Sequence, residues 1–264
     1  MYRDYWGLKR LPFNNVPDTL FFYCSKSHEE AVARILYAAR MGKGIAVVTG
    51  VAGCGKTLLG RVTMRELAEE RFDTALIAAP PLEPLEFVQE VLFQFGMKDA
   101  SDNKAKCLQR LGERLRANSG KKRNTLLIID EAHAQPRATM DEARFLMNFQ
   151  TDHHFLITMI LLGQPGLSER LEWLKQRTVI RYHLGPFDFN DTVHYILFRQ
   201  RRAGGKTNVF NRDAMERIHD YSGGIPAKIN DLCDLSLFEG FNSKEEVVSG
   251  EVVKRVIHDD SLFR

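Results

Sequence analysis

The chain has 264 residues, 44% of them hydrophobic, which is enough for one large α/β domain or for a large domain and a small one. Its 37 Lys and Arg residues and 34 Asp and Glu residues leave a net charge of +3, which by itself neither indicates nor excludes nucleic-acid binding. The four cysteines are scattered without a Cys-x-x-Cys pair, which argues against zinc and disulfide frameworks and indicates a reducing compartment.

The chain begins with an aromatic-rich segment, residues 1–23, around Pro12 and Pro17. Because so many aromatic side chains need burial, this lead-in is expected to be irregular in backbone but packed rather than disordered. Residues 28–41 then show the apolar spacing of an amphipathic helix.

A buried strand is expected at Ile45–Thr49, and the pattern G-x-x-x-x-G-K-T follows it. In this pattern glycines turn the backbone so that its N–H groups surround phosphate, at the start of a helix whose dipole favours an anion. The helix is expected over residues 58–71, so strand, loop and helix come in the required order. The residues predicted to contact a nucleotide here are Gly50, Val51, Ala52, Gly53, Cys54, Gly55, Lys56, Thr57 and Leu58.

Within this loop, Lys56 is expected to reach the β- and γ-phosphates of ATP, and the Thr57 hydroxyl is expected to ligate Mg²⁺. The aromatic lead-in has two open roles, namely core packing and contact with the adenine ring.

Strands and helices then alternate. Further strands are expected at Thr74–Ala79, 125–129, 155–162 and 179–184, and helices at 85–95, 104–117, 138–149 and 167–175. This order predicts an α/β fold of the P-loop NTPase type, with a doubly wound parallel five-stranded sheet.

Two carboxylates, Asp130 and Glu131, end the strand that begins at residue 125. Because the carboxyl ends of neighbouring parallel strands lie at one edge of a sheet, Asp130 is expected to hold Mg²⁺ with Thr57. Glu131 is then placed to deprotonate the attacking water. Gln164, at the end of the next strand, either senses the γ-phosphate or is a turn residue.

After residue 186 the strand pattern stops. Helices are expected at 191–202, 211–221, 227–238 and 249–258, separated by glycine pairs or polar residues. The sequence thus predicts two domains: a P-loop ATPase domain at residues 1–186, which includes the lead-in, and a small helical lid domain at residues 187–264.

These motifs together resemble an AAA+ ATPase, and more closely the general secretion pathway protein A (ExeA/GspA) type. The resemblance covers almost the whole chain. It is carried by Tyr5-Trp6-Gly7-Leu8, the phosphate loop, Ile129-Asp130-Glu131-Ala132-His133, Leu162-Gly163-Gln164-Pro165, residues 181–186 and Gly223-Gly224-Ile225-Pro226. Transposition ATPases of the TniB and MuB kind share this module.

The resemblance implies a homo-oligomer, expected as a ring, in which a neighbour completes each ATP site. Arg177 is then the candidate arginine finger and Arg181 the second choice, while ordinary surface arginines remain the alternative. After Gly-Gly-Ile-Pro the family usually has an arginine that reaches the γ-phosphate, but here Ala227 stands there. Lys228 follows, about 100° further around the helix, and is the candidate residue for this nucleotide contact.

The resemblance implies an ATP-hydrolysing protein that serves assembly of a secretion or pilus-type envelope machine. Two alternatives stay open: a DNA-associated ATPase that recruits a transposase, and a slow nucleotide-dependent scaffold. Without a signal sequence or a run of about 20 apolar residues, the chain is expected in the cytoplasm, with no transmembrane segment. Secretion members commonly continue into a transmembrane helix, so the chain is either a module of a longer protein or a stand-alone relative.

Overall fold

The computed structural model describes residues 2–78, 80–98 and 101–259, so Ala79, the last residue of one predicted strand, lies outside the described residues. The chain divides into two compact units. We call Ser27–Val51 with Lys56–Leu184 the sheet unit, and Met1–Lys26, Ala52–Gly55 and Gly185–Arg264 the helical unit. Within the described residues, no helix is both long and apolar enough to span a bilayer.

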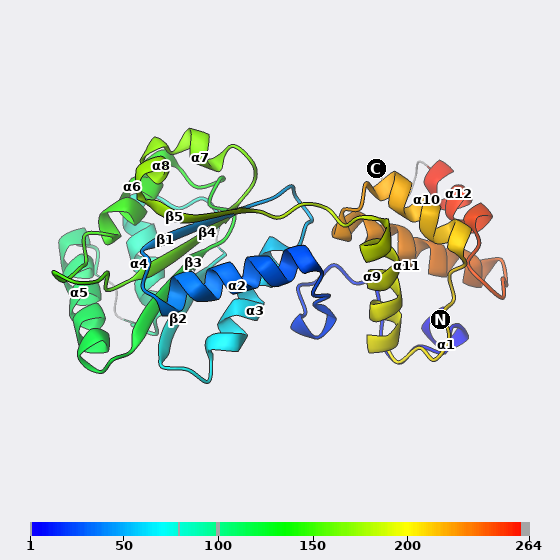
Figure 1. Ribbon diagram of the computed structural model, residues 1–264, viewed down its shortest axis with the longest axis horizontal. Coiled ribbons are helices and arrows are strands. Elements are labelled where there is room, and N and C mark those ends of the chain that lie inside the picture. The colour runs from blue at the N-terminus through cyan, green and yellow to red at the C-terminus, as the bar shows by residue number, and fades with distance from the viewer. Residues whose placement is uncertain (1, 79, 99–100, 260–264) are drawn as a thin grey trace. The chain divides into compact units, whose positions relative to one another are not determined.

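The sheet unit is built on five strands in the order β2-β3-β4-β1-β5, all pairing in parallel (Figure 1). The strands are β1 (Ile45–Thr49), β2 (Phe72–Ile77), β3 (Asn124–Ile129), β4 (Thr158–Gly163) and β5 (Thr178–His183). This topology confirms the predicted parallel doubly wound sheet. Since β4 lies between β3 and β1, the segments that follow these three strands meet at one edge.

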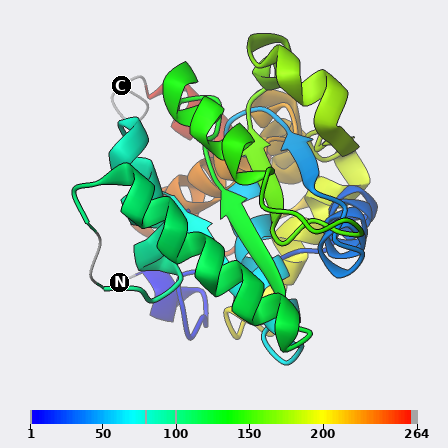
Figure 2. The same ribbon diagram turned by 90° about the vertical axis from the view of Figure 1, so that its left-hand side faces the viewer.

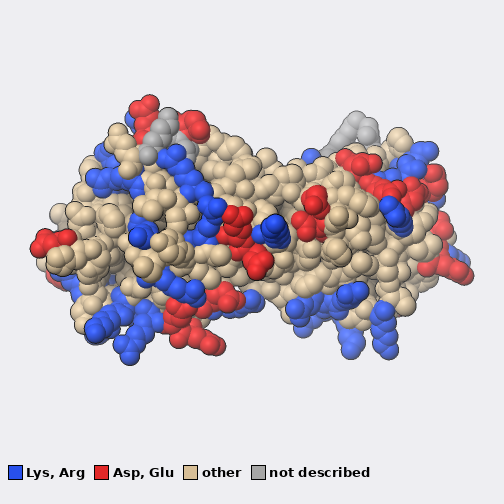
Figure 3. All heavy atoms as spheres, viewed as in Figure 1, with Lys and Arg blue, Asp and Glu red and all other residues tan. Residues whose placement is uncertain are grey.

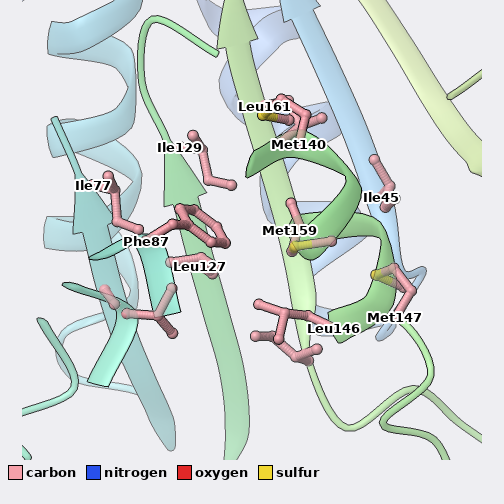
Figure 4. Close-up of a cluster of buried hydrophobic side chains, with 14 of the residues drawn as sticks. Ile45, Ile77, Phe87, Leu127, Ile129, Met140, Leu146, Met147, Met159 and Leu161 are labelled. Atoms are coloured by element: carbon pink, nitrogen blue, oxygen red, sulfur yellow. The ribbon is translucent and has the colours of Figure 1, made fainter. Parts of the chain in front are cut away.

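Helices cover both faces of this sheet; Figure 2 shows α5 and α2 on opposite sides of the strands. The helices are α2 (Lys26–Arg40), α3 (Lys56–Leu67), α4 (Pro84–Gln94), α5 (Lys104–Gly120), α6 (Arg137–Leu146), α7 (Leu167–Arg170) and α8 (Glu172–Arg177). Alternate residues of the strands pack with α4, α5, α6 and the α7–α8 segment in one apolar cluster. In Figure 4, Phe87 of α4 lies beside Ile77 and Leu127, and Met140 of α6 lies near Leu161.

Several predicted elements differ in the structure; the helix expected at 58–71, for example, ends at Leu67. The strand expected from residue 155 begins only at Thr158, because Leu156 N–H donates to the Phe149 carbonyl and Phe155 forms an isolated bridge with Gln150. The helix expected at 167–175 is two short helices, since Leu171 has the non-helical angles φ −117° and ψ 82°. The helix expected to reach residue 149 ends at Leu146.

The helical unit has its own apolar core. Its helices are α1 (Tyr2–Tyr5), the 3₁₀ helix η1 (Thr19–Phe21), α9 (Phe189–Arg202), α10 (Arg212–Ser222), α11 (Pro226–Asn242) and α12 (Gly250–His258). Trp6 and Phe13 from the lead-in are buried in this core, where Phe13 contacts Phe210 edge to face. The Trp6 indole N–H donates to the Leu237 carbonyl at 2.9 Å.

A buried arginine joins the lead-in to α9. Arg199 is 5% exposed and donates to the carbonyls of Pro12 (2.5 Å) and Asn14 (2.9 Å). The lead-in therefore groups with the helical unit, whereas its sequence was predicted to belong to the ATPase domain at residues 1–186. The physical reason is that the helices supply the apolar surface that the lead-in aromatics require.

Candidate nucleotide-binding site

The phosphate loop runs from the end of β1 into the first turn of α3. Gly53 (φ +84°) and Gly55 (φ +93°) adopt the left-handed backbone conformation that other residues rarely take. At Gly50, a Cβ atom would lie 2.6 Å from the Leu184 carbonyl oxygen, so only glycine fits there. The glycines of the predicted pattern thus have conformational and steric reasons to be present.

Lys56 is the first residue of α3, and its side chain extends back over the phosphate loop. It is 4% exposed, and its ammonium group donates to the carbonyls of Gly50 (2.9 Å) and Val51 (3.1 Å). A buried ammonium at the start of a helix, where backbone N–H groups and the helix dipole favour an anion, is the arrangement that attracts a polyphosphate. Cys54 is fully buried, and the Leu58 side chain is half-buried at the start of α3.

Thr57 and Asp130 are brought together although 73 positions separate them. The Thr57 hydroxyl donates to Asp130 Oδ2 at 2.6 Å, and Asp130 is 3% exposed. A hydroxyl and one carboxylate are hard oxygen donors, which suit Mg²⁺ because this ion takes one or two carboxylates and completes its shell with phosphate and water. These two residues therefore fit the predicted metal site.

Glu131 follows Asp130 at the turn that leaves β3. Its backbone lies in the left-handed region (φ +49°), its N–H donates to Asp130 Oδ1 at 3.0 Å, and its side chain is 49% exposed. Gln164 follows β4, whose last residue Gly163 accepts the Gly50 N–H at 3.1 Å. The start of the phosphate loop, Glu131 and Gln164 therefore lie at one edge of the sheet.

Arg177 lies at the opposite edge. It is the exposed last residue of α8, directly before Thr178, which pairs with Ile45 at the amino end of β1. Because the phosphate loop follows the carboxyl end of β1, Arg177 is outside the candidate site of its own chain. Arg181 donates to the Leu174 carbonyl at 3.1 Å, which gives it a structural contact.

Lys228 and Ala227 lie in the first turn of α11, in the helical unit. The Lys228 side chain is exposed and forms no ion pair among the described residues. Ala227 instead uses its backbone: its N–H donates to the Gly53 carbonyl at 3.2 Å. Loop residue Gly53 belongs to the same unit, so this contact joins the phosphate loop to α11 without any long side chain.

Asn15 is a polar residue of this region that the sequence analysis did not single out. Its amide Nδ2 donates to Asp231 at 2.7 Å and approaches the Ala227 carbonyl at 3.4 Å. Burial and the charge of Asp234 raise the pKa of Asp231 above its usual range, although the bond from Asn15 opposes the shift. The aromatic content of the lead-in predicted burial, but no sequence signal marked this amide.

His133 and Arg170 lie beside Glu131 and were also missed as functional candidates. The His133 Nδ1 atom is 3.5 Å from Glu131 Oε2. Arg170 donates to the backbone carbonyls of His133 and Gln135. His133 follows Asp-Glu-Ala in the sequence, which was a usable signal. Arg170 binds backbone carbonyls, so the sequence contains no signal for its role.

A comparison with protein families agrees with this geometry. A family model described as an AAA domain matches residues 39–171, which include the phosphate loop, Asp130, Glu131 and Gln164. The chain belongs to the AAA domain family. General secretion pathway protein A of Aeromonas hydrophila is 31% identical over 259 residues, which are 96% of this chain and 47% of that protein. The predicted resemblance to the ExeA/GspA type is confirmed, and the chain spans about half the length of this curated relative.

Solved structures share the fold at low identity. ORC1 of Aeropyrum pernix, solved in complex with DNA, superposes with a TM-score of 0.68 and 16% identity, covering 94% of this chain and 68% of that one. The RuvB Holliday junction branch migration motor of Thermotoga maritima gives a TM-score of 0.59 and 18% identity, covering 88% and 68%. At such identities the similarity shows a common fold.

Proposed function

We propose that this chain binds ATP together with Mg²⁺ and hydrolyses the γ-phosphate bond. The observation that carries the proposal is the junction of the phosphate loop with the end of β3. There the buried Lys56 lies over the loop, and Thr57 and Asp130 share a hydrogen bond of 2.6 Å. Thr57 and Asp130 would hold the metal ion, which when bound neutralises charge on the phosphates.

Glu131 is the proposed base. It accepts a proton from the attacking water, whose oxygen bonds to the γ-phosphorus, while the bond to the bridging oxygen breaks and ADP leaves with that electron pair. Lys56 stabilises charge on the phosphate oxygens, and the Gln164 amide orients the water or contacts the γ-phosphate.

The chain is further proposed to act as a homo-oligomer in assembly of a secretion or pilus-type envelope machine, at the cytoplasmic face of the membrane. The support is the 31% identity to general secretion pathway protein A. Arg177 suits a role as arginine finger in the site of a neighbouring subunit, because it is exposed and distant from its own site. Such a finger contributes about 10³-fold to 10⁵-fold in rate.

The test is steady-state ATP hydrolysis measured against protein concentration, together with the mass of the particle in each nucleotide state. A specific rate that rises with concentration is expected for a finger acting between subunits. Lys56→Ala should abolish nucleotide binding, whereas Glu131→Gln should retain binding and lose hydrolysis. Turnover in Glu131→Gln equal to that of the wild type would exclude Glu131 as base. A low, concentration-independent rate from a monomer would favour the slow scaffold.

A second candidate function, DNA binding, is favoured by one observation on the helical unit. We call Lys9, Arg10, Arg201, Arg202 and Lys206 the basic cluster. Backbone N–H groups of Lys9 and Arg10 both donate to the Ala203 carbonyl, at 2.7 and 3.1 Å, which brings the two segments together. All five side chains are exposed, and none forms an ion pair within the described part of the chain. Figure 3 shows Lys and Arg gathered around the lower end of α9 without Asp or Glu among them.

The basic cluster does not include Arg199, although this arginine is close to it in the sequence. Arg199 is buried and bonded to backbone carbonyls, so it does not belong to the surface. Fluorescence anisotropy with duplex DNA tests the cluster. If all five cations contact phosphates, affinity should fall about 500-fold between 50 and 200 mM salt. The fivefold glutamine variant should lose this binding, while Lys121→Gln/Lys122→Gln should keep it. Equal affinity of the fivefold variant would reject the cluster as a DNA site.

A further inference from the structure

The turn that carries Glu131 has an uncommon backbone that neighbouring groups hold in place. A non-glycine residue at φ +49° costs about 1–2 kcal/mol, so other contacts must fix it. Ala132 N–H donates to the Leu162 carbonyl of β4 at 2.8 Å, and Ala134 N–H donates to the Glu131 carbonyl at 2.8 Å. The turn is thus attached to the neighbouring strand.

Arg170 holds the same turn from a second side. Its guanidinium donates to the His133 carbonyl and, at 2.7 Å, to the Gln135 carbonyl. Gln135 is fully buried, and its amide binds the Leu82 N–H at 3.1 Å and the Pro80 carbonyl at 3.3 Å. Backbone motion between Glu131 and Gln135 is therefore restricted, so the relative position of their backbone atoms is well defined.

The His133 side chain lies within this fixed turn and faces the glutamate. Its Nδ1 atom is 3.5 Å from Glu131 Oε2, is shielded from solvent and forms no hydrogen bond. An unpaired buried polar atom carries a penalty, which a small side-chain rotation of Glu131 would remove by closing the distance to Nδ1. The carboxylate is about half exposed, so it has room for that rotation.

We propose that His133 is a positioning residue for Glu131: its Nδ1–H donates to one carboxylate oxygen and leaves the other oxygen oriented toward the attacking water. Arg170 keeps His133 in reach by holding the turn. This inference rests on the proposed function of the site, since it assigns how the base of that reaction is oriented. His133 itself touches neither nucleotide nor water in this scheme.

The kinetic test compares three substitutions in the full chain. His133→Phe keeps a ring of similar shape without nitrogen and should lower kcat about 10-fold to 100-fold, as loss of an orienting partner does. KM and nucleotide affinity should stay within about twofold, because binding uses other groups. His133→Asn, whose amide nitrogen takes the place of Nδ1, should recover most of the rate. His153→Phe, at an exposed loop histidine, is the matched control and should leave the rate unchanged.

Coupling to Glu131 is tested in the Glu131→Gln background, where adding His133→Phe should cause no further loss of residual hydrolysis. A kcat of His133→Phe equal to or above that of the wild type would overturn the proposal. Failure of His133→Asn to exceed His133→Phe would also overturn it.

A second measurement does not depend on turnover. If the wild type hydrolyses no more ATP than Lys56→Ala, the proposed function fails, and NMR of ring-¹⁵N-labelled histidines then decides the contact. The His133 signals, assigned by their absence in His133→Phe, should shift in Glu131→Gln while those of His153 stay in place. Unshifted His133 signals would refute the contact.

Discussion

The contact between Gly53 and α11 gives a quantitative prediction for Gly53→Ala. In the structure Gly53 has φ +84°, and a Cβ atom there would lie 2.8 Å from Ala227 Cβ and 3.0 Å from Ile225 Cγ2. Neither neighbour is the end of a flexible side chain, so the backbone of the loop or of α11 must move. The Ala227 N–H bond to the Gly53 carbonyl, at 3.2 Å, is then lost.

The expected magnitude follows from these three changes. The left-handed conformation costs a non-glycine residue about 1–2 kcal/mol. Overpacking adds roughly 1–3 kcal/mol, and the lost backbone bond about 0.5–1.5 kcal/mol. Part of this is relieved when the loop leaves its conformation, which turns its N–H groups away from phosphate. We therefore expect a total of about 3 kcal/mol, divided between the free energy of unfolding and nucleotide affinity.

The assay combines urea unfolding with titration of a fluorescent ATP analogue. Gly96→Ala is the matched control, because Gly96 has φ +78° with nothing within 4 Å of an added Cβ. It should lose about 1 kcal/mol of unfolding free energy and keep its nucleotide affinity. If Gly53→Ala binds nucleotide like the wild type and is destabilised no more than Gly96→Ala, the reasoning about this contact is refuted.

Three further predictions concern other polar side chains. Burial raises the pKa of Asp73, but hydrogen bonds from Arg114 and Asn118 and the nearby arginine charges lower the pKa overall. The ionised Asp73 carboxylate therefore stabilises the folded protein fully above about pH 4, and this stabilisation is lost as pH falls through the lowered pKa. Urea unfolding of Asp73→Asn from pH 6 to pH 3 should therefore show a shallower acid loss than the wild type. Thr57→Val should weaken the Mg²⁺ dependence of nucleotide affinity about 10-fold or more, as a titration with Mg²⁺ would show. Arg199→Leu should cost about 3 kcal/mol in urea unfolding, whereas the exposed Arg201→Gln should change it by less than about 0.5 kcal/mol.

The candidate nucleotide site was largely predictable because its residues follow the ends of strands. Asp130 and Gln164 each follow an apolar run, and parallel strands bring such positions to one edge of the sheet. The same rule places Arg177 at the other edge, because it precedes a strand instead of following one. The position of Arg177 at that edge could have been predicted from the sequence, but it was not.

The surroundings of Glu131 were not predictable in this way. Arg170 acts on backbone carbonyls, and any residue type offers those, so no residue pattern identifies its partners. The break of the expected helix at Leu171 lets α7 end right after Arg170, although helical periodicity continues through the break. Periodicity describes which side chains are apolar, and it does not reveal a single residue that leaves the helical conformation.

The lead-in shows a related limit. The predicted burial holds for Trp6, Phe13 and Phe21 but not for Tyr5, which is 43% exposed. Composition also does not specify which apolar surface receives the buried rings. The decision depends on polar groups at defined positions, such as the Trp6 indole that donates to Leu237 and Arg199 that binds the Pro12 carbonyl. The residues of each pair are more than 180 positions apart in the chain, so local sequence patterns do not indicate these contacts.

The position of Ala227 shows why a missing motif residue does not remove the link that it usually provides. A search for the family arginine finds alanine there and suggests that α11 is uncoupled from the phosphate loop. The structure joins them through the Ala227 N–H and the Gly53 carbonyl, groups that every residue except proline at position 227 would supply. Glycine at position 53 is what lets α11 approach so closely, since any Cβ there would collide with Ala227. The coupling therefore depends on Gly53, which occupies a variable position of the phosphate-loop pattern, so the pattern does not indicate this role.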